Sequence, residues 1–238
     1  MRLRQAVVLC GGLGTRIAAL AQGRPKALLP VAGRPFLHHL LDWLGFHGVR
    51  EALLLVGHGA EDVELAARAG APEGLAVRVS REPAPLGTGG ALKLAEPQLD
   101  DRFLMMNGDT FLNLDVAALL RRHVVAMPEG AVATLALVRH PHAGEKGAVE
   151  VAADGVITRF VEKGQDGPGL INAGVYLVES AGLMDIQAGA AVSLEREVFP
   201  HWMARAAGRG LRGITTDAYF VDIGLPEDYL RVKDGFPV

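Results

Sequence analysis

The chain has 238 residues, of which 50% are hydrophobic and 21% are charged, and its formal net charge is −3. This composition argues against a disordered chain. The small net charge provides no field to attract nucleic acid, and no apolar run approaches the roughly 20 residues of a membrane-spanning helix. Neither a nucleic-acid partner nor a membrane partner is therefore expected. A single cysteine and the glycines that follow the first apolar run, where a secretory signal would continue, favour the cytoplasm.

Short β-rich runs alternate with longer helical patterns over residues 1–125. Strands are predicted at 5–10, 51–56, 75–80 and 102–107, and helices near 35–47, 60–69, 88–96 and 115–125. In the first of these helices, apolar residues recur at three- and four-residue spacing, and Pro35 stands at its start. This alternation indicates βαβ units and a mostly parallel sheet.

From about residue 130 the pattern changes to more strands with fewer helices between them. Strands are predicted at 131–138, 147–152, 156–163, 170–178, 210–216 and 218–224, with helices at 193–207 and 226–233. Ser193 is suited to cap the first of these helices, although Arg196 stands where a strict capping box needs Glu or Gln. We expect one α/β domain over residues 1–238 with an appended β-rich portion.

The stretch LCGGLGTR at residues 9–16 places glycines directly after the first predicted strand. It lacks the Walker A pattern, and Ile17 occupies the third glycine position of a dinucleotide fingerprint. Glycine amides, the Thr15 hydroxyl and the Arg16 guanidinium are nevertheless groups that hold phosphate, and Arg24 and Lys26 follow in GRPKALLP. The loop is therefore interpreted as a triphosphate or pyrophosphate cradle, the alternative being a tight turn with solvated arginines.

Further segments, in order, extend this pattern along nearly the whole chain: PLGTGGAL from 85, NGDT from 107, FVEK from 160, INAGVYL from 171 and FVDIGLPEDY from 220. Together with the glycine loop they resemble the sugar-phosphate nucleotidyltransferases, which join a nucleoside triphosphate to a sugar 1-phosphate with loss of pyrophosphate. Within that family the motifs are most similar to the D-glycero-α-D-manno-heptose 1-phosphate guanylyltransferases.

The resemblance implies the nucleotide-diphospho-sugar transferase fold, a Rossmann-like, mostly parallel mixed sheet flanked by helices. Residues 1–125 would form the nucleotide-binding half, and residues 126–238, with a small β-rich portion, the sugar-phosphate-binding half. The implied catalytic residues are Arg16, Lys26, Asp109 and Asp222. The implied nucleotide-binding residues are Leu9, Gly11, Gly12, Gly14, Thr15, Arg16, Gly87, Thr88 and Gly108.

Asp109 and Asp222 each follow an apolar run that should be buried, where an unpaired carboxylate is costly. Two carboxylates converging on Mg²⁺ would resolve that cost, and the resemblance assigns the metal to these two residues. Strand-end capping is the alternative for Asp109. For Thr88 the alternative to nucleotide binding is a simple cap of its own helix.

On the sugar side, the resemblance assigns the sugar phosphate to Glu162, Lys163, Asn172 and Gly174. A solvated strand end is the ordinary alternative for Glu162 and Lys163, and a backbone hydrogen bond is the alternative for Asn172.

Base choice is the weakest part of the resemblance. GTP is favoured, but the family often carries a glutamate where this chain has Ala84, and the sequence offers no unambiguous carboxylate to read guanine, although Glu82 lies close by. Mannose 1-phosphate guanylyltransferases and uridylyl- or thymidylyltransferases acting on other hexose 1-phosphates share most of these motifs.

Two readings outside this activity stay open. A non-catalytic nucleotide-sugar binding module would keep the fold without turnover, and a Rossmann oxidoreductase is weakened by Ile17. Cys10 and the histidines, including His38 and His39, are expected to have packing or surface roles, because the spacing of a zinc site is missing. The sequence sets no oligomeric state.

Overall fold

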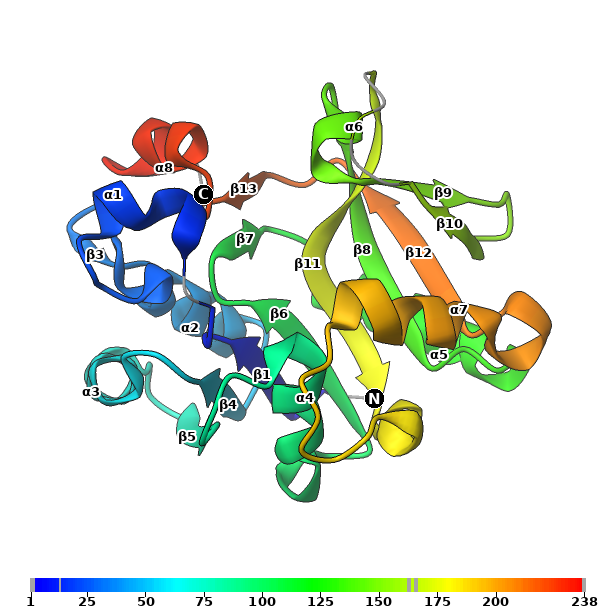
Figure 1. The fold of residues 1–238 in the computed structure, drawn as a ribbon, viewed down its shortest axis with the longest axis horizontal. Helices are drawn as coiled ribbons and strands as arrows, with labels where there is room; N and C mark the ends of the chain where they lie inside the picture. Colours follow the sequence, from blue (N-terminus) through cyan, green and yellow to red (C-terminus); the bar gives the residue numbers. More distant parts are fainter. Residues whose placement is uncertain (1–2, 13, 162–163, 165–166, 237–238) are drawn as a thin grey trace.

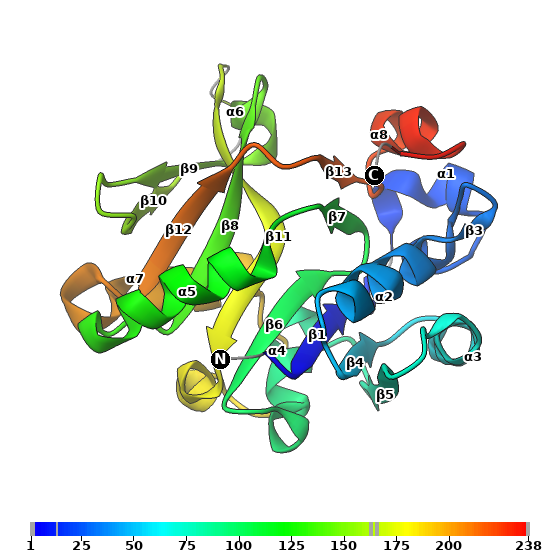
Figure 2. The same cartoon turned by 180° about the vertical axis from the view of Figure 1, so that it is seen from behind.

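The protein is described here from a computed structural model, which covers residues 3–12, 14–161, 164 and 167–236. Over these residues the chain forms a nine-stranded mixed sheet with helices on both faces (Figures 1 and 2). Glu162 and Lys163 lie outside the described residues. None of the helices in the described ranges has the length and apolar character needed to cross a bilayer.

The first half contains four parallel strands in the spatial order β6, β1, β4, β5. These are β1 (Gln5–Leu9), β4 (Glu51–Val56), β5 (Ala76–Arg81) and β6 (Arg102–Asn107). The connecting helices are α2 (Phe36–Phe46), α3 (Ala60–Gly70) and α4 (Gly87–Leu94), and α5 (Val116–Ala126) follows β6. All eight predicted elements of this half are confirmed to within about two residues at their ends, as expected where each element carries its own hydrophobic period.

The inner parallel strands β1, β4 and β6 are apolar and buried through their middle because both faces of the sheet are covered there, whereas the edge strand β5 is mostly exposed or half-buried. On β1, Ala6 and Val8 join a core beneath α2, α3 and α5, whereas Val7 faces a second core that includes Leu92 of α4 and Trp202 of α7 (Phe199–Gly208). Figures 1 and 2 show these two helical layers from opposite sides. Because the strands are parallel and packed on both faces, their carboxyl ends lie together at one edge of the sheet. The glycine loop follows β1 at this edge.

The second half is organised around β11 (Gly169–Glu179), which pairs antiparallel with three strands. These are β6, β8 (Ala133–His140) and β9 (Ala148–Val151). Strand β10 (Ile157–Phe160) pairs with β9, and β12 (Leu211–Thr216) lies parallel to β8. The predicted fold class, a mostly parallel mixed sheet flanked by helices, is confirmed.

The predicted helix at 193–207 is divided into a π-helical turn, η6 (Leu194–Val198), and α7. Pro200 stands at the start of α7 and cannot donate the backbone hydrogen bond that a continuous helix would need there. The predicted cap is confirmed, because the Ser193 hydroxyl accepts from the Arg196 N–H at 3.2 Å. Helical geometry ends at Arg205, and Ala206 and Ala207 have positive φ.

Several short elements carry no sequence pattern long enough to predict, and some of them shape the site. They are β2 (Pro30–Val31), β3 (Arg34–Pro35), β7 (Thr110–Leu112), α1 (Ala18–Ala21), α6 (Ala143–Lys146), and the 3₁₀ turns η1 (Thr15–Ile17), η2 (Lys26–Leu28), η3 (Glu96–Gln98), η4 (Met127–Glu129) and η5 (Ser180–Asp185). The predicted strand at 218–224 is β13 (Phe220–Asp222), and the closing helix is α8 (Pro226–Val232).

Candidate active site

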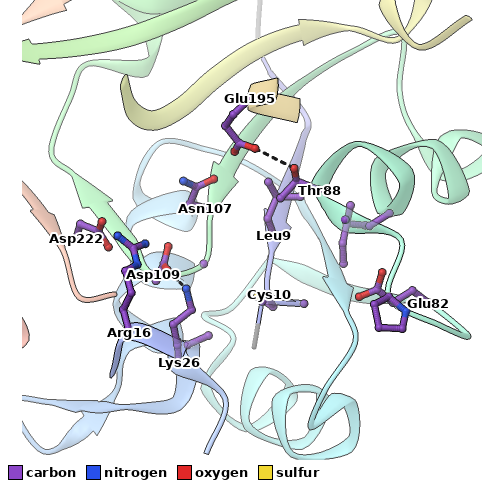
Figure 3. A pocket seen from close by; sticks show the side chains of 18 residues that line it. Leu9, Cys10, Arg16, Lys26, Glu82, Thr88, Asn107, Asp109, Glu195 and Asp222 are labelled. Carbon is purple, nitrogen blue, oxygen red and sulfur yellow. Dashed lines mark hydrogen bonds and ion pairs between the residues drawn. The ribbon is translucent and has the colours of Figure 1, made fainter. Parts of the chain in front are cut away.

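A cavity of about 440 Å³ lies at the carboxyl ends of β1 and β6 (Figure 3). The chain runs from β1 outward through β4 and β5, then returns to place β6 on the other side of β1. Ligands of open α/β sheets bind at such a reversal of strand order. Ten of the residues assigned from the sequence line the cavity: Leu9, Gly11, Gly12, Arg16, Lys26, Gly87, Thr88, Gly108, Asp109 and Asp222.

The glycine loop is shaped by two side chains that reach into the cavity. A Cβ on Gly14, whose φ is +64°, would lie 2.7 Å from Lys26 Cγ, and a Cβ on Gly11 would lie 2.8 Å from Glu82 Oε1. Gly14 therefore lets the loop pack on the Lys26 stem, and Gly11 gives the Glu82 carboxylate its place. Ile17, which stands where a dinucleotide fingerprint has its third glycine, is a buried core residue.

The two predicted metal carboxylates are brought together by the short β7–β13 ladder. Asp222 pairs with Thr110, and the Ile223 N–H donates to the Asp109 carbonyl at 2.8 Å. A Cβ on Gly224 would lie 2.8 Å from Asp222 Oδ1 and 2.9 Å from Asp109 Oδ2, so both carboxylates border the same backbone position. The absence of a side chain at residue 224 keeps the space between them open.

Two cations accompany these carboxylates, as Figure 3 shows. Lys26 Nζ forms an ion pair with Asp109 Oδ2, with only 19% and 14% of the two side chains exposed. Burial and the neighbouring Asp109 charge raise the pKa of Asp222 to about 6, and the charges of Arg16 and Lys26 oppose that rise. The site holds two carboxylates that repel each other and two basic side chains that reduce the repulsion.

This arrangement fits a magnesium ion. Mg²⁺ is usually held by one or two carboxylates and completes its shell with water and substrate phosphates, and the raised pKa of Asp222 shows that an additional positive charge would be favourable there. Within the described ranges no group of three or more potential metal-ligating side chains gathers. The pair Asp109 and Asp222 suits a cation that a phosphate ligand helps to bind.

Thr88, on the first turn of α4, connects that helix to η6. Its hydroxyl accepts from the Leu194 N–H at 2.8 Å and donates to Glu195 Oε2 at 3.2 Å. The alternative in which Thr88 caps its own helix is wrong, because α4 begins at Gly87 and has no side-chain cap. Glu195, which also lines the cavity, was missed from the sequence, where it reads as an acidic residue in a first helical turn.

Glu82 follows the end of β5 and lines the cavity beside Gly11 and Gly57. Its Oε2 accepts from the Leu86 N–H at 2.9 Å, which fixes the carboxylate. The sequence offers no unambiguous carboxylate for the base, although Glu82 lies close to Ala84; the structure places Glu82 in the cavity wall. The feature that marks Glu82 as a wall residue is its close approach to Gly11 and Gly57, which only the tertiary structure reveals.

Four predicted residues do not line the cavity: Gly14, Thr15, Asn172 and Gly174. The last two form an irregularity in β11, where the register shifts between Asn172 and Tyr176. The Asn172 amide is used internally, accepting from the Gly174 N–H at 3.0 Å and donating to the Tyr176 hydroxyl at 2.9 Å. These bonds include the backbone hydrogen bond that was the alternative for Asn172.

The cysteine and the histidines have the expected packing roles. Cys10 is 7% exposed, and burial, reinforced by the Asp109 charge, raises the pKa of its thiol to about 12. His38 Nε2 lies 2.8 Å from the Ala66 carbonyl, and His39 Nε2 lies 2.9 Å from the Val31 carbonyl. Cys10 therefore borders the cavity as an inert wall residue.

Comparison with known proteins agrees with this geometry. The family model described as "Nucleotidyl transferase" matches residues 5–236, so the chain belongs to the nucleotidyl transferase family. Solved structures share the fold: a structure described as a "Putative Glucose-1-Phosphate Thymidylyltransferase" from Bacillus anthracis superposes with a TM-score of 0.80 at 20% identity, covering 97% of this chain and 94% of that chain.

Particular relatives sharpen the comparison. The chain is 36% identical over 228 residues to a mannose-1-phosphate guanylyltransferase from Mycobacterium tuberculosis, covering 95% of this chain but 62% of that protein. It is 30% identical to a D-glycero-alpha-D-manno-heptose 1-phosphate guanylyltransferase from Aneurinibacillus thermoaerophilus, covering 96% of each chain. The crystal structure of HddC from Yersinia pseudotuberculosis complexed with GMP-PN superposes with a TM-score of 0.84 at 29% identity, covering 98% of this chain and 99% of that chain.

Proposed function

We propose that this chain transfers a guanylyl group from GTP to a sugar 1-phosphate and releases pyrophosphate. The observation that carries the proposal is the composition of a single cavity. Two carboxylates and two basic side chains gather around Asp109 in one part of it, and the Glu82 carboxylate, held by a hydrogen bond, lies in another part. The names of the relatives point to the same chemistry.

For the sugar we favour D-glycero-α-D-manno-heptose 1-phosphate, because the heptose-specific relative and this chain match over nearly the full length of both. Mannose 1-phosphate is the second candidate, supported by the higher identity of the mycobacterial relative, of which this chain spans only 62%.

In this proposal each half has its own task. Residues 1–125 bind the nucleotide: Arg16 and Lys26 with the loop around Gly11, Gly12, Gly14 and Thr15 hold the phosphates, and Leu9, Gly87, Thr88 and Gly108 surround the nucleoside. Residues 126–238 bind the sugar phosphate through Glu162, Lys163, Asn172 and Gly174, with Asp222 returning to the metal site. We place the reaction in the cytoplasm, as the buried single cysteine suggests.

The chemistry needs positioning and charge neutralisation more than acid–base catalysis. An oxygen of the sugar phosphate, already an anion, forms a bond to the α-phosphorus as the bond to the pyrophosphate oxygen breaks. Asp109 and Asp222 would hold the magnesium ion, which when bound neutralises phosphate charge. Arg16 meets the departing pyrophosphate, and Lys26, kept in place by Asp109, contacts the phosphates of the bound nucleotide.

Glu82 gives a physical reason for guanine. The guanine edge presents two adjacent donors, N1–H and the 2-amino group, and a carboxylate can accept from both. Uracil and thymine present a single N3–H between two carbonyl oxygens, which a carboxylate would repel. The Leu86 N–H donates to Glu82 Oε2 and so restricts the orientation of the carboxylate. A carboxylate held in one orientation can distinguish the donors of guanine from the carbonyl oxygens of uracil and thymine.

The decisive experiment measures pyrophosphate release for each of GTP, ATP, UTP and dTTP with each of heptose, mannose and glucose 1-phosphate. We expect turnover with GTP and Mg²⁺, highest with the manno-configured heptose phosphate. Activity confined to UTP or dTTP would refute the guanylyl assignment. Tight binding of a nucleotide sugar without turnover for any pair would instead favour the non-catalytic module.

A further inference from the structure

Glu195 is an acidic side chain in the cavity wall for which the proposed reaction has so far given no task. It lies on η6, opposite the glycine loop and beside Thr88, and Figure 3 shows it above Asn107. Among the residues that the structure describes, it forms no ion pair. Glu195 is exposed, so water solvates its carboxylate in the free protein, and a substrate that displaces this water must donate hydrogen bonds in its place.

Among the described residues, the hydrogen bonds to the Glu195 carboxylate all end on one of its two oxygens. The Thr88 hydroxyl accepts from the Leu194 N–H, so its single hydrogen is directed to Glu195 Oε2 at 3.2 Å. The Ser193 hydroxyl accepts from the Arg196 N–H and likewise donates to Oε2, at 3.0 Å. Oε1 has no hydrogen-bond partner among the described residues. Two fixed hydroxyls therefore orient the carboxylate and leave Oε1 available.

The chemistry of the substrates limits what Oε1 can accept from. Phosphate oxygens repel it, whereas the sugar rings of both substrates carry neighbouring hydroxyls, which are donors, and a carboxylate can accept from two such groups at once. When substrate fills the cavity and displaces water, these hydroxyls would replace the water that solvates the exposed Glu195 in the free protein.

We propose that Glu195, oriented by Thr88 and Ser193, binds a pair of neighbouring sugar hydroxyls of a substrate and thereby selects for their presence and configuration. The proposal rests on the proposed function, since it takes the cavity as the site of nucleotide and sugar phosphate. Two sources supply this chemistry, the ribose of the nucleotide and the ring of the sugar 1-phosphate. Glu195 is thus a specificity residue, whereas a purely structural Glu195 would serve only to connect η6 to α4.

The test combines a protein change with the deletion of single hydroxyls from the substrates. Wild type and Glu195→Gln are compared by kcat/KM with GTP, 2′-deoxy-GTP and 3′-deoxy-GTP, and with sugar 1-phosphates lacking the 2- or the 3-hydroxyl. Since charge-assisted hydrogen bonds are lost, we expect Glu195→Gln to lower kcat/KM by about 10- to 100-fold with the full substrates. Deleting the hydroxyl that Glu195 binds should lower kcat/KM in the wild type and change kcat/KM hardly at all in Glu195→Gln.

The source follows from which deletion is non-additive: a ribose deletion assigns the nucleotide, and a ring deletion assigns the sugar phosphate. Additive losses for every deletion would overturn the proposal. Glu197→Gln is the matched control, because Glu197 is exposed, lies on the same turn, accepts from the Ser193 N–H and does not line the cavity. Ser193→Ala removes one of the two hydroxyls that orient Glu195, so it should weaken the selection for the same substrate hydroxyl and should not create selection for a different hydroxyl.

Failure of the proposed function gives a different result. If the wild type uses another ribonucleotide, the same comparison is made with that nucleotide, because all ribonucleotides carry the diol. If there is no turnover, calorimetric affinities of GTP, its two deoxy forms and the GDP-sugars, measured for wild type and Glu195→Gln, provide the same test: equal losses in both proteins would overturn the role of Glu195.

Discussion

The two halves of the molecule are built by different rules. In the first half, parallel strands alternate with helices, so each element is a local pattern, and the glycine loop lies at the carboxyl edge of the sheet because it follows β1 directly. In the second half, β11 pairs with three strands and β13 returns to pair with β7 of the first half. The first half presents the glycine loop and Asp109 to the cavity by local order, whereas the second brings Asp222 there through long-range pairing.

The carboxylate pair is the place where the halves depend on each other, and its removal should have the largest effect. Asp109→Asn or Asp222→Asn should each lower kcat/KM by about 10³-fold or more, since each removes a proposed ligand of the magnesium ion that would neutralise phosphate charge. Pyrophosphate release over a range of Mg²⁺ concentrations measures the loss, and circular dichroism confirms folding. Rates close to wild type for either variant would contradict the shared metal site.

Glu82 tests whether the first half alone selects the base. Glu82→Gln should reduce kcat/KM for GTP by about 10- to 100-fold, because an amide accepts fewer hydrogen bonds from guanine, and should narrow the gap to UTP. The exposed Glu73, which does not line the cavity, gives the matched control Glu73→Gln. An unchanged ratio of GTP to UTP activity would exclude Glu82 as the base-reading residue.

Gly174 tests the irregularity in β11 that the second half requires. Its φ is +68°, and a Cβ would lie 2.7 Å from Asn107 Nδ2 at the end of β6. Gly174→Ala should therefore cost about 1–3 kcal/mol of unfolding free energy from backbone strain and steric contact together. Gly189→Ala is the control, because Gly189 has φ +75° but no atom within 4 Å of its Cβ position. Equal losses in urea unfolding would mean that contact with Asn107 contributes nothing.

The raised pKa of Asp222 predicts a pH-dependent difference in stability. A folded-state pKa above the ordinary 3.8 means that Asp222 favours folding most below pH 4, and that this contribution is lost as pH rises through about 6. In the absence of metal and nucleotide, Asp222→Asn should thus be more stable than wild type at pH 7 by about 1–3 kcal/mol. The difference should shrink toward zero near pH 4 in denaturant titrations; a constant difference would contradict the burial of this charge.

Cys10 should show the smallest response, as an inert part of the first half. Its thiol is buried with a pKa near 12, so almost no thiolate is present at neutral pH. Iodoacetamide at pH 8 should leave the native protein unmodified and alkylate it once in guanidinium chloride, as intact-mass measurement would show. Rapid modification of the native protein would mean that the loop after β1 opens.

Sequence reasoning succeeded where a residue's role follows from its own segment. Arg16, Lys26, Asp109 and Asp222 each stand next to a recognisable run, and all four line one cavity. It gave no role to Glu195 and noted Glu82 only as lying close to Ala84; both line the cavity because distant segments bring Gly11 and Thr88 beside them. Asn172 was correctly seen as a polar residue needing partners, but its partners at Gly174 and Tyr176 could not be deduced without the register of β11.

By itself the sequence determined the alternation of strands and helices in the first half, the position of the glycine loop directly after the first strand and the family. Hydrophobic periods and glycine positions act over a few residues and are legible in one dimension. The tertiary structure alone decided that Asp222 borders Asp109, that Glu82 enters the cavity wall and that, among the described residues, only one oxygen of Glu195 accepts hydrogen bonds. These outcomes depend on strand pairing and close packing between distant segments, where a shift of one residue in register would turn each side chain to the opposite face.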